Sequence, residues 1–250
     1  IEPCEKAKAI AQSLIEGEKR HIFLGNVAEQ HPEAATIHAL TQEIAKLTGA
    51  SFGFLGEAAN SLGGYVAGAL PTANGLNAYE MLAQPRKAYV VLGAELDRDA
   101  HNAQLATAAL KQAAFSVVLT SFKDGSVAET ADALLPIAPF TETSGTFVNA
   151  EGRVQGFNGV VAPLGETRPG WKVLRVLGNV LGLSGFDFMS SEAVRDTVIS
   201  AKAEFATGLD NGLKDVTPAM AAAPAGLARI ADVPIHFADM LARRAPALQQ

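Results

Sequence analysis

ADALLPIAPFTETSGTFVNAEGRVQ, residues 131–155, is the stretch that decides the fold. Its first half carries an apolar run at residues 133–137, typical of a buried strand, and the run ends at Pro139 because proline cannot donate to a sheet ladder. The chain then turns at Ser144-Gly145 and again at residues 149–152. The stretch predicts a buried strand followed by a hairpin with glycine at both bends. Spacing alone favours an ordinary pair of exposed β-turns.

Strand and helix patterns alternate upstream of this stretch. The strand patterns are nearly all apolar, as in sheets that are covered on both faces, and each is followed by a helical periodicity. This alternation predicts an α/β fold with a Rossmann-like, mostly parallel sheet and helices on both faces. The strands are expected at residues 21–25, 51–55, 88–93 and 115–119, and the helices at residues 5–16, 33–47, 77–83, 99–113 and 126–131.

The alternation of strand and helix patterns ends after Gln155. Residues 156–168 hold glycine and proline and predict a loop, whereas residues 169–181 and 191–205 have helical apolar spacing. Residues 206–226 are rich in Gly, Ala, Pro and Asp and are typical of a linker. We therefore expect an α/β domain over residues 1–187 and a helical or extended C-terminal extension over residues 188–250.

Composition narrows the possible functions. The formal charge of −6 gives no positively charged surface for binding nucleic acid. Only 18% of the residues are charged, which suits a protein whose surface is covered by neighbouring proteins. Cys4 is alone, so it makes neither an internal disulfide nor an iron–sulfur site. The longest uncharged run, residues 58–79, is too broken by glycine and Pro71 to predict a membrane span. Because the first residue is Ile1 and no signal pattern follows, we expect a piece of a longer chain.

Few patterns indicate a catalytic or binding site. The glycine-rich residues 56–65 either cradle phosphate on backbone N–H groups or form a tight irregular loop, and no GxGxxG order is present. No histidines stand at metal-ligand spacing, and no GxSxG elbow occurs. Glu142, Glu151 and Arg153 either polarise a bound group or pair to hold the hairpin. We therefore predict no catalytic residue and no metal site.

Residues 131–155 resemble the "ADxxLP…E…GTFxNxEGRxQ" signature of the molybdopterin oxidoreductase superfamily, and in particular of the family of large iron–sulfur subunits of NADH-quinone oxidoreductase, respiratory complex I. The tail resembles the same family's "R…VPIYxxDxxxRRAxxLQ" segment, where Arg243-Arg244 is either an exposed basic helix end or an anchor onto a partner or the parent chain. The matching residues are Ala131, Asp132, Leu135, Pro136, Glu142, Gly145, Thr146, Phe147, Asn149, Glu151, Gly152, Arg153, Gln155, Pro234, Asp239, Arg243, Arg244, Leu248 and Gln249.

The resemblance implies a layer that holds the guanine-dinucleotide tail of a molybdopterin at the carboxyl ends of strands. At two such places this chain departs from the pattern. Glu95 stands where a "GxNP" turn has asparagine, which puts an anion where phosphates approach, and Thr120 stands where an aspartate ends the next strand. We therefore expect no bound cofactor and only relic pterin-site positions: Asn60, Gly64, Glu95, Thr120, Gly145 and Asn149.

The resemblance further implies a structural module of the peripheral arm of complex I, on the cytoplasmic side of the bacterial inner membrane. Its partners would be other peripheral-arm subunits and the missing N-terminal part of its own chain, which carries the iron–sulfur clusters. The alternative is a fragment of a molybdenum oxidoreductase, such as a formate dehydrogenase, that binds molybdopterin guanine dinucleotide. A third possibility is an unrelated nucleotide-binding α/β domain.

Overall fold

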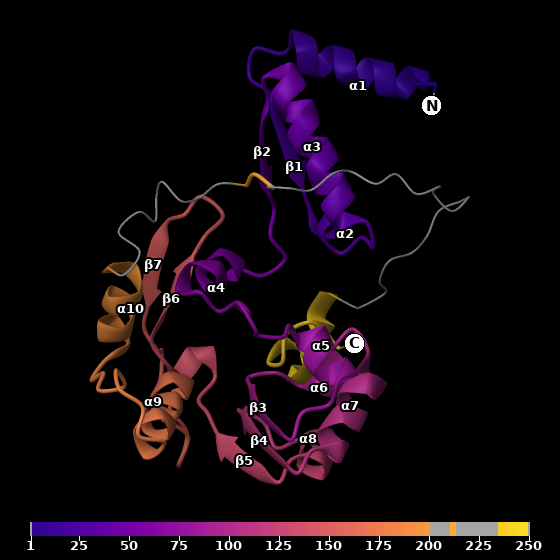
Figure 1. Cartoon of the computed structure of the whole chain (residues 1–250). Helices are drawn as coiled ribbons and strands as arrows, with labels where there is room; N and C mark the ends of the chain where they lie inside the picture. The colour runs from indigo at the N-terminus through magenta and orange to yellow at the C-terminus, as the bar shows by residue number, and fades with distance from the viewer. Residues whose placement is uncertain (1, 201–210, 214–234, 250) are drawn as a thin grey trace. The chain divides into compact units, whose positions relative to one another are not determined.

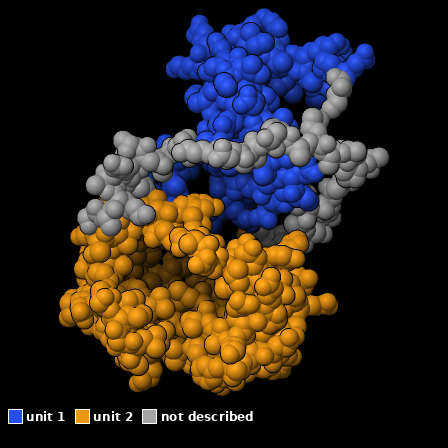
Figure 2. Space-filling view, viewed as in Figure 1, with its two compact units in different colours: residues 1–62, 148–153, 204–232 blue, residues 63–147, 154–203, 233–250 orange. Residues whose placement is uncertain are grey.

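The computed structural model describes residues 2–200, 211–213 and 235–249 (Figure 1). The chain divides into two compact units (Figure 2): unit 1 comprises residues 1–62, 148–153 and 204–232, and unit 2 comprises residues 63–147, 154–203 and 233–250. Both units mix helices with parallel strand pairs, which confirms the predicted α/β class. The domain boundary expected at residue 187 stays a prediction. The expected linker lies outside the described residues, apart from residues 211–213.

Unit 1 is built on a pair of parallel strands. β1 pairs with β2 in the register His21↔Ser51 to Leu24↔Phe54. The connecting helix α3 ends at Gly49, whose left-handed φ of 69° is a conformation that glycine adopts without steric cost. His38 of α3 packs edge-on against Phe52 and Phe54 of β2, which fixes the helix on the strands. The elements of unit 1 are α1 (Glu5–Glu16), β1 (His21–Leu24), α2 (Asn26–Glu29), α3 (Ala34–Thr48) and β2 (Ser51–Phe54).

Unit 2 contains a three-stranded parallel sheet in the order β3-β4-β5. Val90 of β3 faces Val117 of β4, which in turn faces Ala133 of β5. Figure 1 shows α5, α6, α7 and α8 gathered beside these strands. The elements are α4 (Ser61–Ala67), α5 (Ala78–Ala83), β3 (Ala88–Leu92), α6 (Leu96–Asp99), α7 (Ala103–Gln112), β4 (Phe115–Thr120), α8 (Gly125–Thr130) and β5 (Ala133–Pro136).

The core of unit 2 lies between this sheet and its helices. Tyr89 of β3 packs with Ala109 and Leu110 of α7, and its hydroxyl donates to the carbonyl of Met81 at 2.7 Å. Ser116 is fully buried in β4 and donates to the Asp132 carboxylate. Asp132 of the signature therefore ties the segment that leads into β5 to its neighbouring strand.

Beyond β5 the chain forms a second strand pair. β6 (Gly145–Val148) and β7 (Val154–Phe157) make this pair, after the short η1 (Phe140–Glu142). The turn expected at Ser144-Gly145 is absent, because Gly145 begins β6 and the ring of Phe157 lies where its side chain would be. The remaining described elements are α9 (Gly170–Val180), α10 (Ser191–Ser200), η2 (Ile235–Phe237), η3 (Ala242–Arg244) and η4 (Pro246–Leu248).

The structure differs from two further expectations in local detail. The helix predicted over residues 99–113 is present as α7 but begins at Ala103, because the Asn102 side chain accepts the N–H of Leu105 and caps it, and the separate short helix α6 precedes it. The stretch expected to be a glycine-rich loop carries α4 in its second half, although two of that helix's residues are glycine.

Candidate functional site

The ends of β3 and β4 place a group of charged side chains at one edge of the sheet. β3 ends at Leu92, and Gly93 then takes a left-handed φ of 60° that directs the chain into Glu95. After β4, Asp124 caps α8 by accepting the N–H of Gly125 at 2.7 Å. Because parallel strands end at the same edge, Glu95 and Asp124 lie together there.

Glu95 is the centre of this group. Only 1% of its side chain is exposed, and each of its carboxylate oxygens meets a different arginine of the C-terminal tail. Arg243 Nη1 donates to Glu95 Oε2 at 2.9 Å, and Arg244 Nη2 donates to Oε1 at 2.5 Å. A buried carboxylate needs such partners, because burying an unpaired charge is very costly.

Two aspartates also accept hydrogen bonds from the arginines. Arg243 Nη2 donates to Asp99 Oδ1 at 2.5 Å, and Arg244 Nη2 donates to Asp124 Oδ2 at 2.9 Å. Arg98 also reaches Asp124, at 2.7 Å. The hydrogen bond from the backbone N–H of Gly125 and that from Arg98 hold the pKa of Asp124 below its ordinary value. We name Glu95, Asp97, Asp99 and Asp124 the acidic edge.

The tail reaches the acidic edge in a conformation that its own residues hold. The Asp239 side chain accepts the N–H groups of Leu241 and Ala242 at 2.9 and 2.8 Å, which starts the turn that carries the two arginines. Gln249 Nε2 closes it by donating to the carbonyl of Ala242 at 2.9 Å. In Figure 1 this segment is the yellow coil beside α5 and α6. We name residues 235–249 the arginine segment.

Aromatic rings pack against the two guanidinium groups. Arg244 Cζ lies 4.2 Å from the centre of the Phe122 ring, and Arg243 Cζ lies 5.4 Å from that of Phe237. Thr120 positions Phe122, because its hydroxyl accepts the Phe122 N–H and donates to the Phe122 carbonyl, both at 3.1 Å. Such cation–π contacts favour arginine over lysine.

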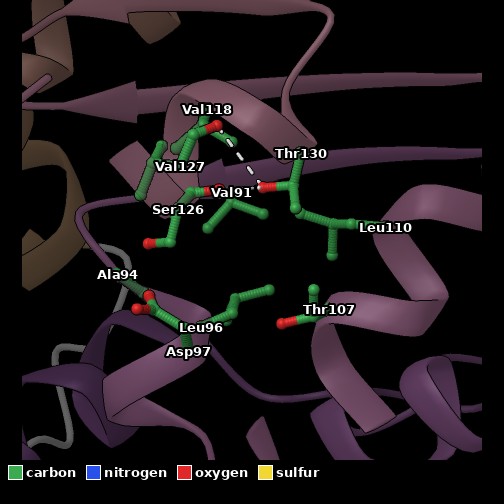
Figure 3. A pocket seen from close by; sticks show the side chains of 10 residues that line it. All are labelled: Val91, Ala94, Leu96, Asp97, Thr107, Leu110, Val118, Ser126, Val127 and Thr130. Atoms are coloured by element: carbon green, nitrogen blue, oxygen red, sulfur yellow. Dashed lines mark hydrogen bonds between the residues drawn. The ribbon is translucent and has the colours of Figure 1, made fainter. Parts of the chain in front are cut away.

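A small cavity lies next to this group (Figure 3). Its volume is about 20 Å³, which is room for about one water molecule, whereas pockets for small organic ligands have several hundred Å³. Ser126 Oγ is buried and has no hydrogen-bond partner among the described residues. The lining residues are Val91, Ala94, Leu96, Asp97, Thr107, Leu110, Val118, Ser126, Val127 and Thr130.

The predicted site residues separate into different places. Glu95 follows β3 and Thr120 ends the neighbouring β4, so both lie at the same edge of the sheet. Asn60 and Asn149 belong to unit 1, where the side chain of each accepts hydrogen bonds from backbone N–H groups. Asn60 Oδ1 accepts the N–H of Val148 at 2.8 Å, and Asn149 Oδ1 accepts those of Glu151 and Arg153 at 3.1 and 2.9 Å.

The two predicted glycines have unequal surroundings. A Cβ at Gly145 would lie 2.6 Å from Phe157 Cζ, whereas a Cβ at Gly64 would meet nothing within 4 Å. Of the acidic groups expected near the hairpin, Glu142 accepts the N–H of Leu164 at 2.9 Å. Glu151 lies 3.9 Å from Arg153, with both side chains exposed. The hairpin is therefore held by Asn149 rather than by an ion pair.

Sequence reasoning missed Arg98, Asp99 and Asp124 and left Arg243-Arg244 with two interpretations. The arginine pair anchors onto its own chain. A signal did exist, because Asp97 and Asp99 follow one strand and Asp124 follows the next, so their carboxylates collect at one edge. Nothing in the sequence pattern joins that edge to residues more than a hundred positions away.

Comparison with known proteins shows the family to which the chain is similar. A family model described as molybdopterin oxidoreductase matches residues 4–180, well over half of the chain. The chain belongs to this family. It is 36% identical over 117 residues to the probable oxidoreductase YjgC of Bacillus subtilis, which covers 45% of this chain and 12% of that protein.

Two further relatives of this molybdopterin oxidoreductase chain carry more specific names. It is 35% identical over 97 residues to a nitrate reductase of Synechocystis sp., covering 38% of this chain and 14% of the relative. It is 38% identical over 81 residues to a Staphylococcus aureus protein named "Putative formate dehydrogenase", covering 32% of this chain and 8% of the relative. The match thus spans less than a sixth of the length of each of these relatives.

The family name implies a molybdopterin, and the strand ends of this molybdopterin oxidoreductase chain do not fit the dinucleotide end of such a cofactor. Four carboxylates and three arginines fill the edge with mutual ion pairs. The neighbouring cavity of about 20 Å³ is far smaller than a nucleotide. In the described parts of the chain, no three His, Cys, Asp or Glu side chains converge as metal ligands.

None of the helices in the described residues combines the length and the apolar character that spanning a bilayer requires.

Proposed function

We propose that this chain is a structural module of NADH:quinone oxidoreductase, respiratory complex I, and forms part of its large iron–sulfur subunit. The observation that carries the proposal is the buried Glu95, held by Arg243 and Arg244 where a dinucleotide would meet the sheet. Protein groups take the place of the ligand, so the module contributes shape and contact surface. It has no redox centre of its own, and the iron–sulfur clusters belong to the rest of the parent polypeptide.

Two further observations support this proposal. The tail residues that resemble the complex I pattern make contacts that build the arginine segment, Asp239 and Gln249 by capping it and the two arginines by pairing with Glu95. Val176 and Val180 of α9 are 53% and 78% exposed, so apolar surface is available to neighbouring subunits. The partners are other peripheral-arm subunits and the remainder of the chain, on the cytoplasmic side of the bacterial inner membrane.

A second candidate function is binding of molybdopterin guanine dinucleotide within a molybdenum oxidoreductase. The relatives named as a nitrate reductase and a formate dehydrogenase favour it. It requires the arginine segment to leave the acidic edge, and a phosphate group to bind beside the carboxylates of that edge. The negative charges of the phosphate and the carboxylates would repel each other, so this candidate is the weaker one.

The decisive experiment is purification of the parent assembly through a tag on this chain. We expect NADH-dependent quinone reduction, iron, and no stoichiometric molybdenum or tungsten by metal analysis. Formate or nitrate turnover together with about one molybdenum per chain would replace the first proposal by the second. As a control, the isolated chain is expected neither to oxidise NADH nor to carry a flavin absorbance.

A further inference from the structure

We infer that the acidic edge is a binding site for paired arginines, and that the arginine segment of the same chain occupies it. This inference concerns what the edge recognises, and it holds whichever oxidoreductase the parent is. Its ligand class is a peptide with two consecutive arginines, and its occupant in this structure is the chain's own residues 235–249.

The charges of the edge select a cation. Four carboxylates, those of Glu95, Asp97, Asp99 and Asp124, face Arg98 and the two tail arginines. If the tail were removed, Arg98 would be the one arginine left in these described ion pairs, opposite four negative charges. Such an edge repels phosphate and attracts guanidinium groups.

The geometry selects two arginines in succession. One carboxylate oxygen of Glu95 accepts from Arg243 and the other accepts from Arg244, so two consecutive arginines bind the same carboxylate. Each arginine then extends to a second acid, Arg243 to Asp99 and Arg244 to Asp124. A guanidinium group can bridge two carboxylates with several fixed donors, whereas a lysine ammonium is a compact point charge.

The surroundings match the flat shape of the guanidinium as well. The ring of Phe122 lies against Arg244, and the Thr120 hydroxyl fixes the turn that carries Phe122. The Arg243 side chain is only 2% exposed, so its donors are withdrawn from water and directed at carboxylates and at the carbonyl of Ala238. Such a site loses affinity strongly when one donor is missing.

The experiment uses the full chain with Arg243→Ala and Arg244→Ala together, and a fluorescent synthetic peptide of residues 235–249. The peptide is titrated against the variant and against the unaltered chain, and its anisotropy is followed. We expect the variant to bind the peptide at least about tenfold more tightly than the unaltered chain, whose edge is already occupied. The affinity should fall as salt rises. A peptide with both arginines replaced by lysine should bind at least about tenfold more weakly.

Two controls separate recognition from misfolding and from general charge loss. The variant Arg86→Ala/Arg153→Ala removes two exposed arginines outside the cluster and should behave like the unaltered chain. If circular dichroism shows that the double-alanine variant is unfolded, Arg243→Lys/Arg244→Lys takes its place, because it keeps the charge but not the bridging donors. The arginine peptide should then displace the lysine-bearing segment.

Guanosine diphosphate provides the competing test. We expect it to bind neither the unaltered chain nor the folded variant, because the freed edge is acidic. Binding of the nucleotide to the variant would show that the segment covers a phosphate site, and would overturn the inference. Equal binding of the arginine and lysine peptides, or no peptide binding to a folded variant, would overturn it as well.

Discussion

At the scale of single residues, Arg243 is the side chain whose removal we expect to cost most. The change Arg243→Met leaves the buried Glu95 Oε2 with only the longer contact to Arg98, at 3.3 Å, and removes the arginine partner of Asp99. Breaking a buried ion pair from one side typically costs about 3–5 kcal/mol. We therefore expect the free energy of unfolding, measured by urea denaturation, to fall by about that amount.

The double variant Glu95→Gln/Arg243→Met identifies the origin of this cost. With the buried charge removed, part of the lost stability should return, so the two changes should not add. Arg153→Met is the matched control, because its pair with Glu151 is exposed and 3.9 Å apart, and such pairs contribute little. An Arg243→Met variant as stable as Arg153→Met would contradict the description of Glu95 as a paired buried charge.

Gly145 gives a second residue-scale prediction. A Cβ there would lie 2.6 Å from Phe157 Cζ, and the Phe157 ring is itself packed edge-on against Phe147. We expect Gly145→Val to lower the melting temperature through overpacking of about 1–3 kcal/mol, and Phe157→Ala to relieve part of that loss. Gly64→Ala is the control, because its Cβ meets open space in α4 and alanine favours a helix. Equal melting of the Gly145→Val variant and the unaltered chain would refute the close contact.

The sequence identified some of these residues but not their partners. Glu95 and Thr120 could be singled out because each follows an apolar strand and departs from the family pattern. Arg243 could be interpreted either as an exposed helix end or as an anchor, because local spacing carries no information about a contact 148 residues away. The need for glycine at position 145 was foreseen for a turn, whereas the structure attributes it to an aromatic ring across the strand pair.

At the scale of elements, Asp124 links α8 to the arginine segment and makes that link depend on pH. Its pKa lies below the ordinary value, first because Gly125 donates its N–H and then because Arg98 donates to the carboxylate. A lowered folded pKa stabilises the fold above the ordinary pKa of about 4, and that contribution disappears as the pH falls through the folded value.

We therefore expect the chain to lose stability below a pH of about 4, and Asp124→Asn to lose less over the same interval. The measurement is the urea midpoint at a series of pH values from about 6 to 3, for both proteins. Asp196→Asn provides a control at an aspartate that also pairs with an arginine but is more exposed. Identical pH profiles for the unaltered chain and Asp124→Asn would contradict the role given to Asp124.

Elements were predictable where the local sequence pattern determines them. The strands at residues 88–92 and 115–120 follow from largely apolar runs, and α1 follows from its helical apolar periodicity. The break between α6 and α7 was missed, because it depends on one asparagine side chain that competes with the helix for a backbone N–H. The arginine segment has too few residues for any periodicity, so only its contacts define it.

At the scale of the whole molecule, the two units differ in how much they bury. The fully buried apolar side chains of unit 2 include Ala106, Val118 and Leu119, whereas the buried apolar side chains described in unit 1 are Ala39, Ala45 and Val148. Helix α1 has no buried residue at all. Since an isolated helix of this length is marginal in water, packing must supply stability that α1 lacks.

This difference predicts an order of opening. Amide hydrogens exchange through local unfolding wherever few apolar contacts oppose it, so α1 should exchange first, β1 and β2 next, and β4 last. Hydrogen–deuterium exchange followed by mass spectrometry of peptides would measure this order. Arg243→Met should speed exchange at β3 and β4, because their strand ends are joined to the arginine segment, while leaving α1 unchanged. Slower exchange in β1 and β2 than in β4 would mean that buried apolar area does not set local stability in this protein.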